Sequence, residues 1–138
     1  VLHRLAGEPP VTYRPILADV PDGTWYTAGS IWAAENNIAT DWKEGAFAPT
    51  ENVSRQELVV TLYHYAEWAG YDTSRRADLS TFPDGDQVPA EVRDAVSWAV
   101  AADILRGGSG GKLLLSEPTG RAQVATMIWR FTNWMEAI

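Results

Sequence analysis

The amino-acid sequence predicts an all-α fold made of repeated helix–loop–helix modules. A helix start is visible at Ser54, whose hydroxyl can accept hydrogen bonds from the unpaired amides of a first turn. Glu57 stands three residues later, where its side chain completes a capping box. Leu58, Leu62 and Tyr65 then follow at the spacing of one helix face. The same pattern returns later in the chain, which indicates a repeat architecture.

The two copies lie 66 positions apart, so that Trp32 matches Trp98 and Arg55 matches Arg121. We assign residues 15–76 to the first repeat and residues 77–138 to the second. Residues 1–14 are interpreted as the tail of a preceding repeat followed by a linker. Because a single unit cannot cover its own apolar face, we expect the units to pack around a shared helical core.

Capping signals and turn residues set the expected elements. Gly7 and Gly70 are predicted to close helices as C′ glycines. For residues 1–76 we expect, in order, a helix end at 1–7, an extended linker at 8–15, a turn at 17–23, a helix at about 25–37, a loop at 38–52 and a helix from 54 to about 68. For the second repeat we expect a helix at about 89–103, a glycine-rich loop at 107–111, a short strand or buried loop at 113–115 and a last helix from about 121 onward. The inward positions of that last helix are expected to be Val124, Ile128, Phe131 and Met135.

Composition excludes several classes of function. The formal net charge is −7, which argues against binding to nucleic acid and against a general attraction to anionic membranes. The chain has no cysteine and therefore no disulfide or thiolate metal site. No apolar run reaches the ~18 residues that a membrane span needs. An anionic partner would require a local pocket of positive potential.

Arg55 and Arg121 are candidate ligand-binding residues because each stands at the first position of a predicted helix. A cation there slightly opposes the helix dipole, so solubility alone does not call for one. An anion would be held by the guanidinium together with the free amides of the first turn. The alternative is a solvated arginine, or one that pairs with Glu51 or Glu117, and spacing alone leaves both open.

Other side chains favour structural roles. Trp32 and Trp98 lie on apolar helix faces and are expected in the core, whereas Trp25 could equally line a groove. The Asp84-Gly85-Asp86 segment lacks the spacing of a calcium loop and is interpreted as a solvated turn. The two histidines are not arranged as metal ligands, and no nucleophile motif is present. We therefore expect no metal site, no cofactor and no catalytic residues.

A set of ordered motifs recurs in the two copies. The motifs are Asp19-Val20, Ile31-Trp32-Ala33, Phe47-Ala48-Pro49 and Val53-Ser54-Arg55-Gln56-Glu57 in the first copy, and Ala95-Val96-Ser97-Trp98-Ala99, Asp103-Ile104-Leu105 with Gly107, and Arg121-Ala122-Gln123 in the second. These motifs resemble the S-layer homology module, and the resemblance covers nearly the whole chain. Such modules usually come in threes and fold as a pseudo-threefold helical assembly. They anchor surface proteins to secondary cell-wall polymers of bacteria, often through pyruvylated sugars.

The resemblance implies a non-catalytic, secreted anchor on the bacterial cell surface that binds an anionic cell-wall polysaccharide in grooves between repeats. Asp41 stands where the second copy has Gly107, and its carboxylate would repel an anionic sugar, so the Arg55 pocket ranks below the Arg121 pocket. The first module is largely missing, and self-association through that repeat is one way in which chains could complete one another. A helical protein-interaction module and an accessory domain of a cell-wall-active enzyme are the alternatives. The proposed ligand-binding residues are Arg121, Arg55, Ser54, Trp25, Asp19 and Gly107.

Overall fold

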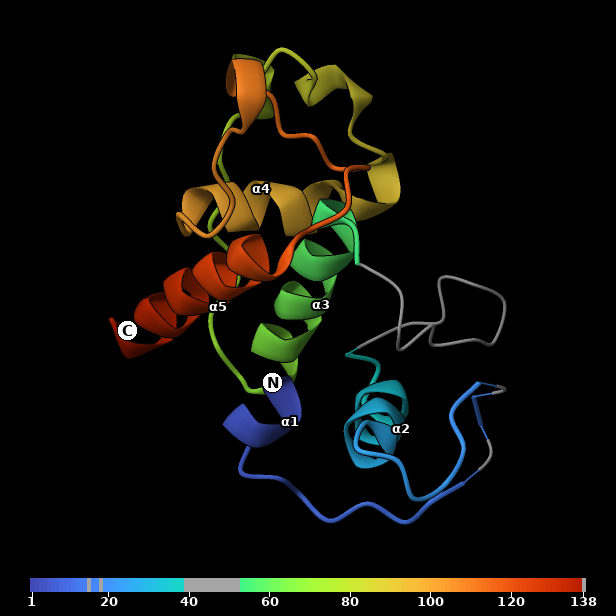
Figure 1. The fold of residues 1–138 in the computed structure, drawn as a ribbon. Helices are drawn as coiled ribbons and strands as arrows, with labels where there is room; N and C mark the ends of the chain where they lie inside the picture. The colour runs from blue at the N-terminus through green and yellow to red at the C-terminus, as the bar shows by residue number, and fades with distance from the viewer. Residues whose placement is uncertain (15, 18, 39–52, 138) are drawn as a thin grey trace. The chain divides into compact units, whose positions relative to one another are not determined.

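The structure is a computed structural model that describes residues 1–14, 16–17, 19–38 and 53–137 (Figure 1). These residues form helices and no strand, which confirms the predicted all-α class. The chain divides into two compact units, Val1–Glu51 and Asn52–Ile138, and each is described by itself. This division differs from the repeat boundaries inferred from the sequence, because the second helix of the first repeat belongs to the second unit. The shared-core arrangement of the repeats stays a prediction.

The first unit contains α1 (Leu2–Leu5) and α2 (Thr27–Glu35). The helix α1 ends as predicted at Gly7, which has φ +87°. The amide of Glu8 donates to the His3 carbonyl and the amide of Gly7 donates to the Arg4 carbonyl, a closure that needs this left-handed residue. The segment therefore has the form of a helix end.

The core of the first unit contains Leu17, Val20 and Ile31. Trp32 is 4% exposed, as expected of a core residue, and its ring lies 5.2 Å from the ring of His3, centroid to centroid. The helix α2 begins two residues later than predicted, at Thr27, whose hydroxyl accepts from the Thr24 amide at 3.0 Å. In this turn a side-chain hydroxyl accepts the hydrogen bond of a backbone amide and so competes with the helix. The spacing of apolar residues does not reveal such a bond.

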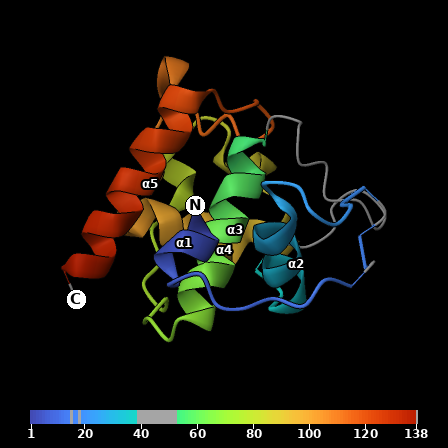
Figure 2. The same ribbon diagram turned by 60° about the horizontal axis from the view of Figure 1, so that its bottom comes forward.

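The second unit contains the remaining elements. In it, the segment predicted as one helix at 89–103 begins as a 3₁₀ turn and continues as an α-helix. Figures 1 and 2 show the three longer helices of this unit. In chain order the elements are α3 (Arg55–Trp68), η1 (Leu79–Thr81), η2 (Gly85–Gln87), η3 (Ala90–Val92), α4 (Arg93–Ala101), η4 (Ser109–Gly111) and α5 (Arg121–Glu136). Gly70 ends α3 as predicted, with φ +85°.

The core of the second unit is centred on Trp98 of α4, which is 1% exposed. The rings of Tyr63 and Phe131 lie 5.4 and 6.3 Å from it, so that α3 and α5 both pack against this residue. Phe131 faces inward as predicted, and Met127, one helical turn earlier, is also buried. The other three positions of α5 that were predicted to face inward, Val124, Ile128 and Met135, are half-buried.

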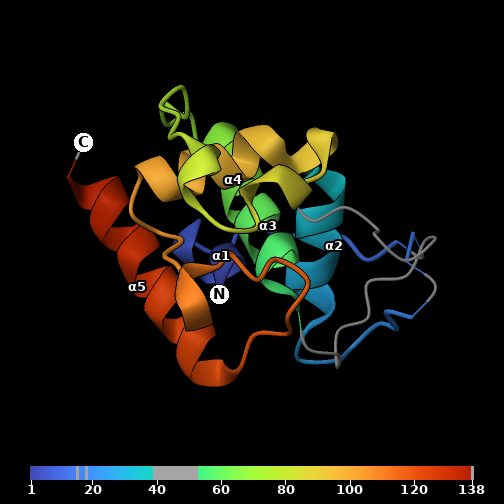
Figure 3. The same ribbon diagram turned by 90° about the horizontal axis from the view of Figure 1, so that it is seen from above.

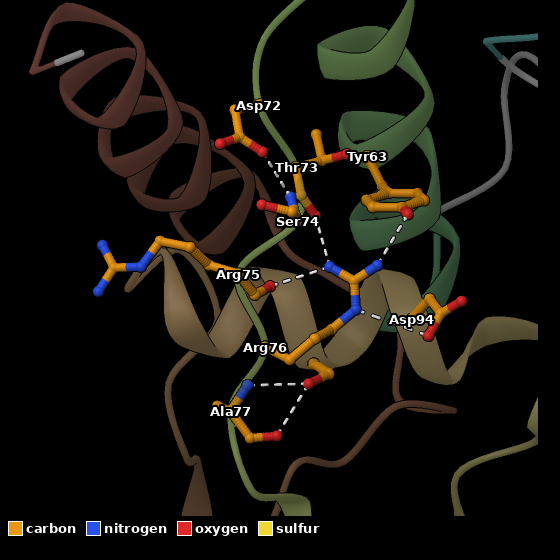
Figure 4. Close-up of polar contacts among 9 residues, drawn as sticks. Tyr63, Asp72, Thr73, Ser74, Arg75, Arg76, Ala77 and Asp94 are labelled. Carbon is orange, nitrogen blue, oxygen red and sulfur yellow. Dashed lines mark hydrogen bonds and ion pairs between the residues drawn. The ribbon is translucent and has the colours of Figure 1, made fainter.

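The connection between α3 and α4 is fixed by Arg76, as Figure 4 shows. Its Nη2 donates to the Tyr63 hydroxyl at 3.2 Å, and its Nε lies 3.6 Å from a carboxylate oxygen of Asp94. The Ser97 hydroxyl accepts from the Ala77 amide at 2.9 Å and donates to the carbonyl of the same residue at 2.8 Å. These bonds hold the connection against both helices. The side chain of Arg75, in contrast, points away from this network in Figure 4.

Candidate functional site

The start of α3 has the capping box that the sequence predicts. The Glu57 amide donates to the Ser54 hydroxyl at 3.1 Å, and the Ser54 amide donates to the Glu57 carboxylate at 3.4 Å. Ser54 is therefore the N-cap, and Arg55 is the first helical residue. The proposed role of Ser54 as a ligand contact stays a prediction, since its hydroxyl already serves the helix.

The remaining amides of the first turn of α3 donate to carbonyls of the segment that leads into α5. The Arg55 amide donates to the Glu117 carbonyl at 3.0 Å, and the Gln56 amide donates to the Leu115 carbonyl at 2.9 Å. Thr119 in turn donates to the Val53 carbonyl, from its amide at 2.8 Å and from its hydroxyl at 2.6 Å. Figure 3 lets the reader follow this segment past the start of α3. The prediction that the first-turn amides bind the ligand was therefore wrong for α3.

The side chain of Arg55 does not match either alternative weighed from the sequence, because it is neither solvated nor paired with a described carboxylate. Its Nε donates to the Leu113 carbonyl at 2.8 Å, and its Nη2 donates to the Arg106 carbonyl at 2.8 Å. Burial lowers the pKa of this guanidinium, the charge of Arg130 lowers it further, and Asp84 opposes both. Glu51 lies outside the described residues. Arg55 thus joins the start of α3 to the glycine-rich loop of the second repeat.

Beside Arg55 lies a groove of about 270 Å³. It brings Arg55 together with Gly107. Gly107 was predicted to pair with Arg121 of the same copy, and that pairing was wrong, because the loop of the second repeat lies against the helix start of the first. A Cβ at Gly107 would lie 3.1 Å from the Gly111 carbonyl oxygen, so only glycine fits there without a shift of the loop. The residues that line the groove are Arg55, Arg106, Gly107, Ala122, Gln123, Thr126, Met127 and Arg130.

Three guanidinium groups surround this groove, although the chain as a whole is acidic. Arg106 is held by Asp103 through two bonds of 2.8 and 2.7 Å, so its charge is largely compensated. Arg130 has one described acceptor, the Ile104 carbonyl, at a long 3.5 Å. Arg130 therefore has most of its donors available to an anion.

Asp84 fixes the loop that Arg55 contacts. Its two carboxylate oxygens accept from the amides of Leu113, at 2.8 Å, and Leu114, at 3.0 Å. Burial raises the pKa of this carboxyl, but the bonds from the two amides and the charge of Lys112 outweigh burial, so the pKa lies below its ordinary value. The interpretation of this segment as a solvated turn was wrong for Asp84. Leu113 is fully buried, so the alternative of a buried loop rather than a strand is the correct one at 113–115.

Arg121 lies apart from this groove in the part of the chain that the structure describes. It is exposed at the first position of α5, and no hydrogen bond or ion pair joins its side chain to a described residue. Its N-cap, Gly120, provides no side-chain bond, as the missing hydroxyl predicts. Whether this site ranks above the Arg55 pocket stays a prediction, and Asp41, on which the ranking depends, lies outside the described residues.

The remaining proposed residues belong to the first unit. Trp25 is 87% exposed, with its ring edge-on to Tyr26 at 5.2 Å, so its indole face is open to a ligand. Asp19 is half-buried and engaged in an interaction of its own. Their membership of a binding groove stays a prediction.

Sequence reasoning missed Arg130, the least compensated cation of the groove. A signal for it exists in the helical spacing, because Gln123, Thr126 and Arg130 recur at intervals of three and four residues and form a polar stripe on α5. In the first repeat the equivalent positions hold Glu57, Val60 and His64, so no arginine corresponds to Arg130. A comparison of the two copies could therefore have found it.

Comparison with known sequences decides the family. The family model described as "S-layer homology domain" matches residues 17–59 and 81–125, one match in each repeat. The chain belongs to the S-layer homology family. Membership implies a role in anchoring a protein at the cell surface to the cell wall. No solved structure matches this S-layer homology chain.

A relative with a curated name is an endoglucanase of Bacillus sp. (strain KSM-635), which is 24% identical to the chain over 105 residues. The match covers 73% of the S-layer homology chain and 11% of the endoglucanase, so the chain spans a small part of that protein's length. Among the described residues, no helix is both long and apolar enough to cross a membrane.

Proposed function

We propose that the chain is a non-catalytic anchor, secreted to the bacterial cell surface, that binds an anionic secondary cell-wall polymer. The observation that carries the proposal is the groove where Arg55, Arg106 and Arg130 meet Gly107 in an otherwise acidic chain. A local concentration of guanidinium groups attracts a carboxylate against the net charge of the protein. Gly107 allows the close approach to Gly111 within the loop that lines this groove.

The proposed ligand is a pyruvylated sugar, whose ketal carries one carboxylate on a compact ring. Arg130 donates to that carboxylate, because its donors are the least occupied of the three arginines. Arg55 shapes the groove by fixing the loop and contributes its remaining donors. Gln123 and Thr126 line the same wall and supply polar contacts to sugar hydroxyls. Arg121, Trp25, Asp19 and Ser54 remain proposed contacts of the polymer outside this groove.

A binding experiment with two forms of the polymer tests the proposal. Purified secondary cell-wall polymer is titrated into the chain by calorimetry, once intact and once after chemical removal of the pyruvyl groups. We expect binding to the intact polymer and at least a tenfold loss after removal, about 1.4 kcal/mol. Equal affinity for both forms would contradict a carboxylate-dependent site.

A second candidate is favoured by the match to part of an endoglucanase: the chain is an accessory domain of an enzyme that acts on polysaccharide. In that case the anchor holds a catalytic domain near its substrate. An assay of glucan hydrolysis on these 138 residues alone separates anchoring from catalysis. We expect no hydrolysis, and measurable turnover would show that the chain itself carries catalytic residues.

A further inference from the structure

Two helices of the chain end in the same backbone closure, one in each repeat. Asn37 follows α2 and Asp103 follows α4, 66 positions later, and both adopt the left-handed conformation, with φ 56° and φ 60°. The amides of the next residues, Ile38 and Ile104, donate 2.9 Å hydrogen bonds back to helix carbonyls. Asparagine and aspartate are among the non-glycine residues that favour this conformation. Because the first copy closes with asparagine, the backbone at position 103 does not require a carboxylate.

The carboxylate of Asp103 binds the guanidinium of Arg106. The Arg106 Nε donates to one carboxylate oxygen at 2.8 Å, and the Nη2 donates to the other at 2.7 Å. This is the two-point geometry in which a guanidinium binds a carboxylate most strongly. Both side chains remain exposed, 68% for Asp103 and 57% for Arg106, and an exposed ion pair contributes little to stability. The stability of the fold therefore does not explain the pair.

The pair lies at the groove, because Arg106 lines it together with Arg55 and Arg130. The other described residues that line this groove are uncharged. The pKa of Asp103 lies below its ordinary value: the hydrogen bonds from Arg106 lower it most, burial opposes them, and the charges of Arg106 and Arg130 lower it further. Asp103 thus interacts with two of the three guanidinium groups that a ligand meets in the groove.

The donors that stay open in the groove suit a singly charged ligand better than a doubly charged one. A carboxylate presents two oxygens, which the largely unoccupied guanidinium of Arg130 satisfies by itself. A phosphate monoester has a charge of about −1.5 to −2 near neutral pH and presents three oxygens, so it gains most from a second guanidinium. Arg106 has two of its donors on Asp103, and Arg55 has two of its donors on carbonyls.

We propose that Asp103 is a specificity-determining residue of the groove, which disfavours phosphate monoesters by occupying Arg106 and leaves a site for a single carboxylate. Specificity often comes from an element that disfavours the wrong ligand. The first copy has neither member of the pair, since Asn37 and Thr40 stand at the two positions, so the pair belongs to this groove alone. The inference rests on the proposed binding of an anionic sugar and names the feature that selects among anionic sugars.

Calorimetric titration of small sugars into the 138-residue chain tests the inference. One probe is a methyl hexoside with a single pyruvate ketal, which carries one negative charge. The second is the same hexoside with a phosphate monoester in place of the ketal, and the third is the unmodified hexoside as the neutral reference. The titrations are carried out near neutral pH at about 0.01 M ionic strength, where the Debye length is about 30 Å and exposed charges are weakly screened.

In the parent we expect the pyruvylated sugar to bind more tightly than the phosphorylated one. Asp103→Asn should raise the affinity for the phosphorylated sugar about tenfold, because it frees the two Arg106 donors, and that for the pyruvylated sugar less than about twofold. Asparagine keeps the backbone conformation, as Asn37 shows. Asp94→Asn is the matched control, since it removes an exposed carboxylate that pairs with Arg76 outside the groove, and it should change both affinities less than about twofold.

A variant in a second background separates the freed guanidinium from the change in charge. Arg106→Gln removes the group that Asp103 occupies, so Asp103→Asn made in that background leaves only the charge effect. We expect its gain for the phosphorylated sugar, measured against Arg106→Gln alone, to fall to about threefold or less. A gain as large as in the parent background would show that Asp103 does not act through Arg106, and the proposal would be overturned.

The titrations also separate this inference from the proposed function. If the parent binds the pyruvylated sugar and Asp103→Asn changes both affinities no more than Asp94→Asn does, the anchoring function stands and the role of Asp103 is overturned. If the parent binds the neutral hexoside as tightly as the pyruvylated one, yet the phosphorylated sugar gains in Asp103→Asn alone, the carboxylate-dependent site is contradicted and the role of Asp103 is supported. A parent and an Asp103→Asn variant that bind neither charged sugar would overturn both.

Discussion

The guanidinium of Arg55 donates from Nη2 to the main-chain carbonyl of Arg106 at 2.8 Å, although 51 positions separate the two residues. This bond, with the one to Leu113, attaches the glycine-rich loop of the second repeat to the helix start of the first. The same guanidinium lines the groove that contains Gly107. One side chain therefore links the stability of the loop to the shape of the proposed binding site.

Arg130→Ala is expected to reduce the affinity for pyruvylated polymer about tenfold or more, because it removes the charge-assisted donor with the fewest partners in the groove. The midpoint of thermal unfolding should stay nearly unchanged, since the one described bond of this side chain is long. Calorimetric titration and circular dichroism measure the two quantities. A variant that binds like the parent would remove Arg130 from the site.

Arg121→Ala is expected to weaken binding to the polymer far more than Arg75→Ala does. Arg121 stands at the helix position where the first copy has a groove-lining arginine, whereas the Arg75 side chain points away from its surroundings (Figure 4). Both side chains are exposed, so neither change should disturb the fold. Retention on purified cell-wall polymer measures the difference, and equal effects would count against Arg121.

Arg55→Ala is expected to lower the free energy of unfolding by about 1–3 kcal/mol, because the carbonyls of Leu113 and Arg106 lose their donor. Arg75→Ala is the control and should stay within about 0.5 kcal/mol of the parent. Urea unfolding followed by tryptophan fluorescence measures both. A destabilisation no larger than that of the control would show that the two bonds contribute little.

Asp84→Asn is expected to cost about 1–3 kcal/mol at neutral pH, because the carboxylate that accepts from two amides is lost. The folded pKa of Asp84 lies below its unfolded value, so this stabilisation is present above the unfolded pKa and is lost as the pH falls through the folded pKa. The difference between parent and variant should therefore shrink in acid.

Urea unfolding at a series of pH values from 7 down to 2.5 follows the Asp84 effect, with Asp86→Asn as the exposed control. A difference between parent and Asp84→Asn that stays constant over this range would contradict the assigned role. A loss of stability of the same size in Asp86→Asn would show that the effect comes from the change in net charge and not from the hydrogen bonds of Asp84.

Gly120→Ser is expected to stabilise α5 by about 0.3 kcal/mol, because serine as N-cap can accept from the first turn as Ser54 does. Gly120 already has extended dihedrals, φ −78° and ψ 169°, and a Cβ there meets nothing within 4 Å. Ser54→Ala provides the converse test and should cost about 1 kcal/mol. Thermal unfolding of both variants measures these effects, which should have opposite signs.

Local sequence signals predicted the features that depend on neighbouring residues. The capping box of Ser54 and Glu57 and the glycine closures at Gly7 and Gly70 were all confirmed. Trp32 and Trp98 were correctly placed in cores, because apolar helical spacing alone identifies a buried face. The predicted start of α2 was two residues too early, because the hydrogen bond between the Thr24 amide and the Thr27 hydroxyl sets where the helix begins.

The candidate site could be predicted in part. Arg55 and Gly107 were singled out, and the structure brings them to one groove. Arg130 was missed, and so was the role of Asp84, because each depends on a contact with a segment distant in sequence. The amides at the start of α3 were expected to be free, yet a distant loop occupies them.

By itself the sequence determined the helical class, the duplication and the helix ends, because capping, turn chemistry and apolar periodicity act within a few residues of the chain. Only the tertiary structure decided which donors are already used and which are open to a ligand. Hydrogen bonds between distant segments are set by packing, and packing gave Arg55 two carbonyl partners while it left Arg130 largely available.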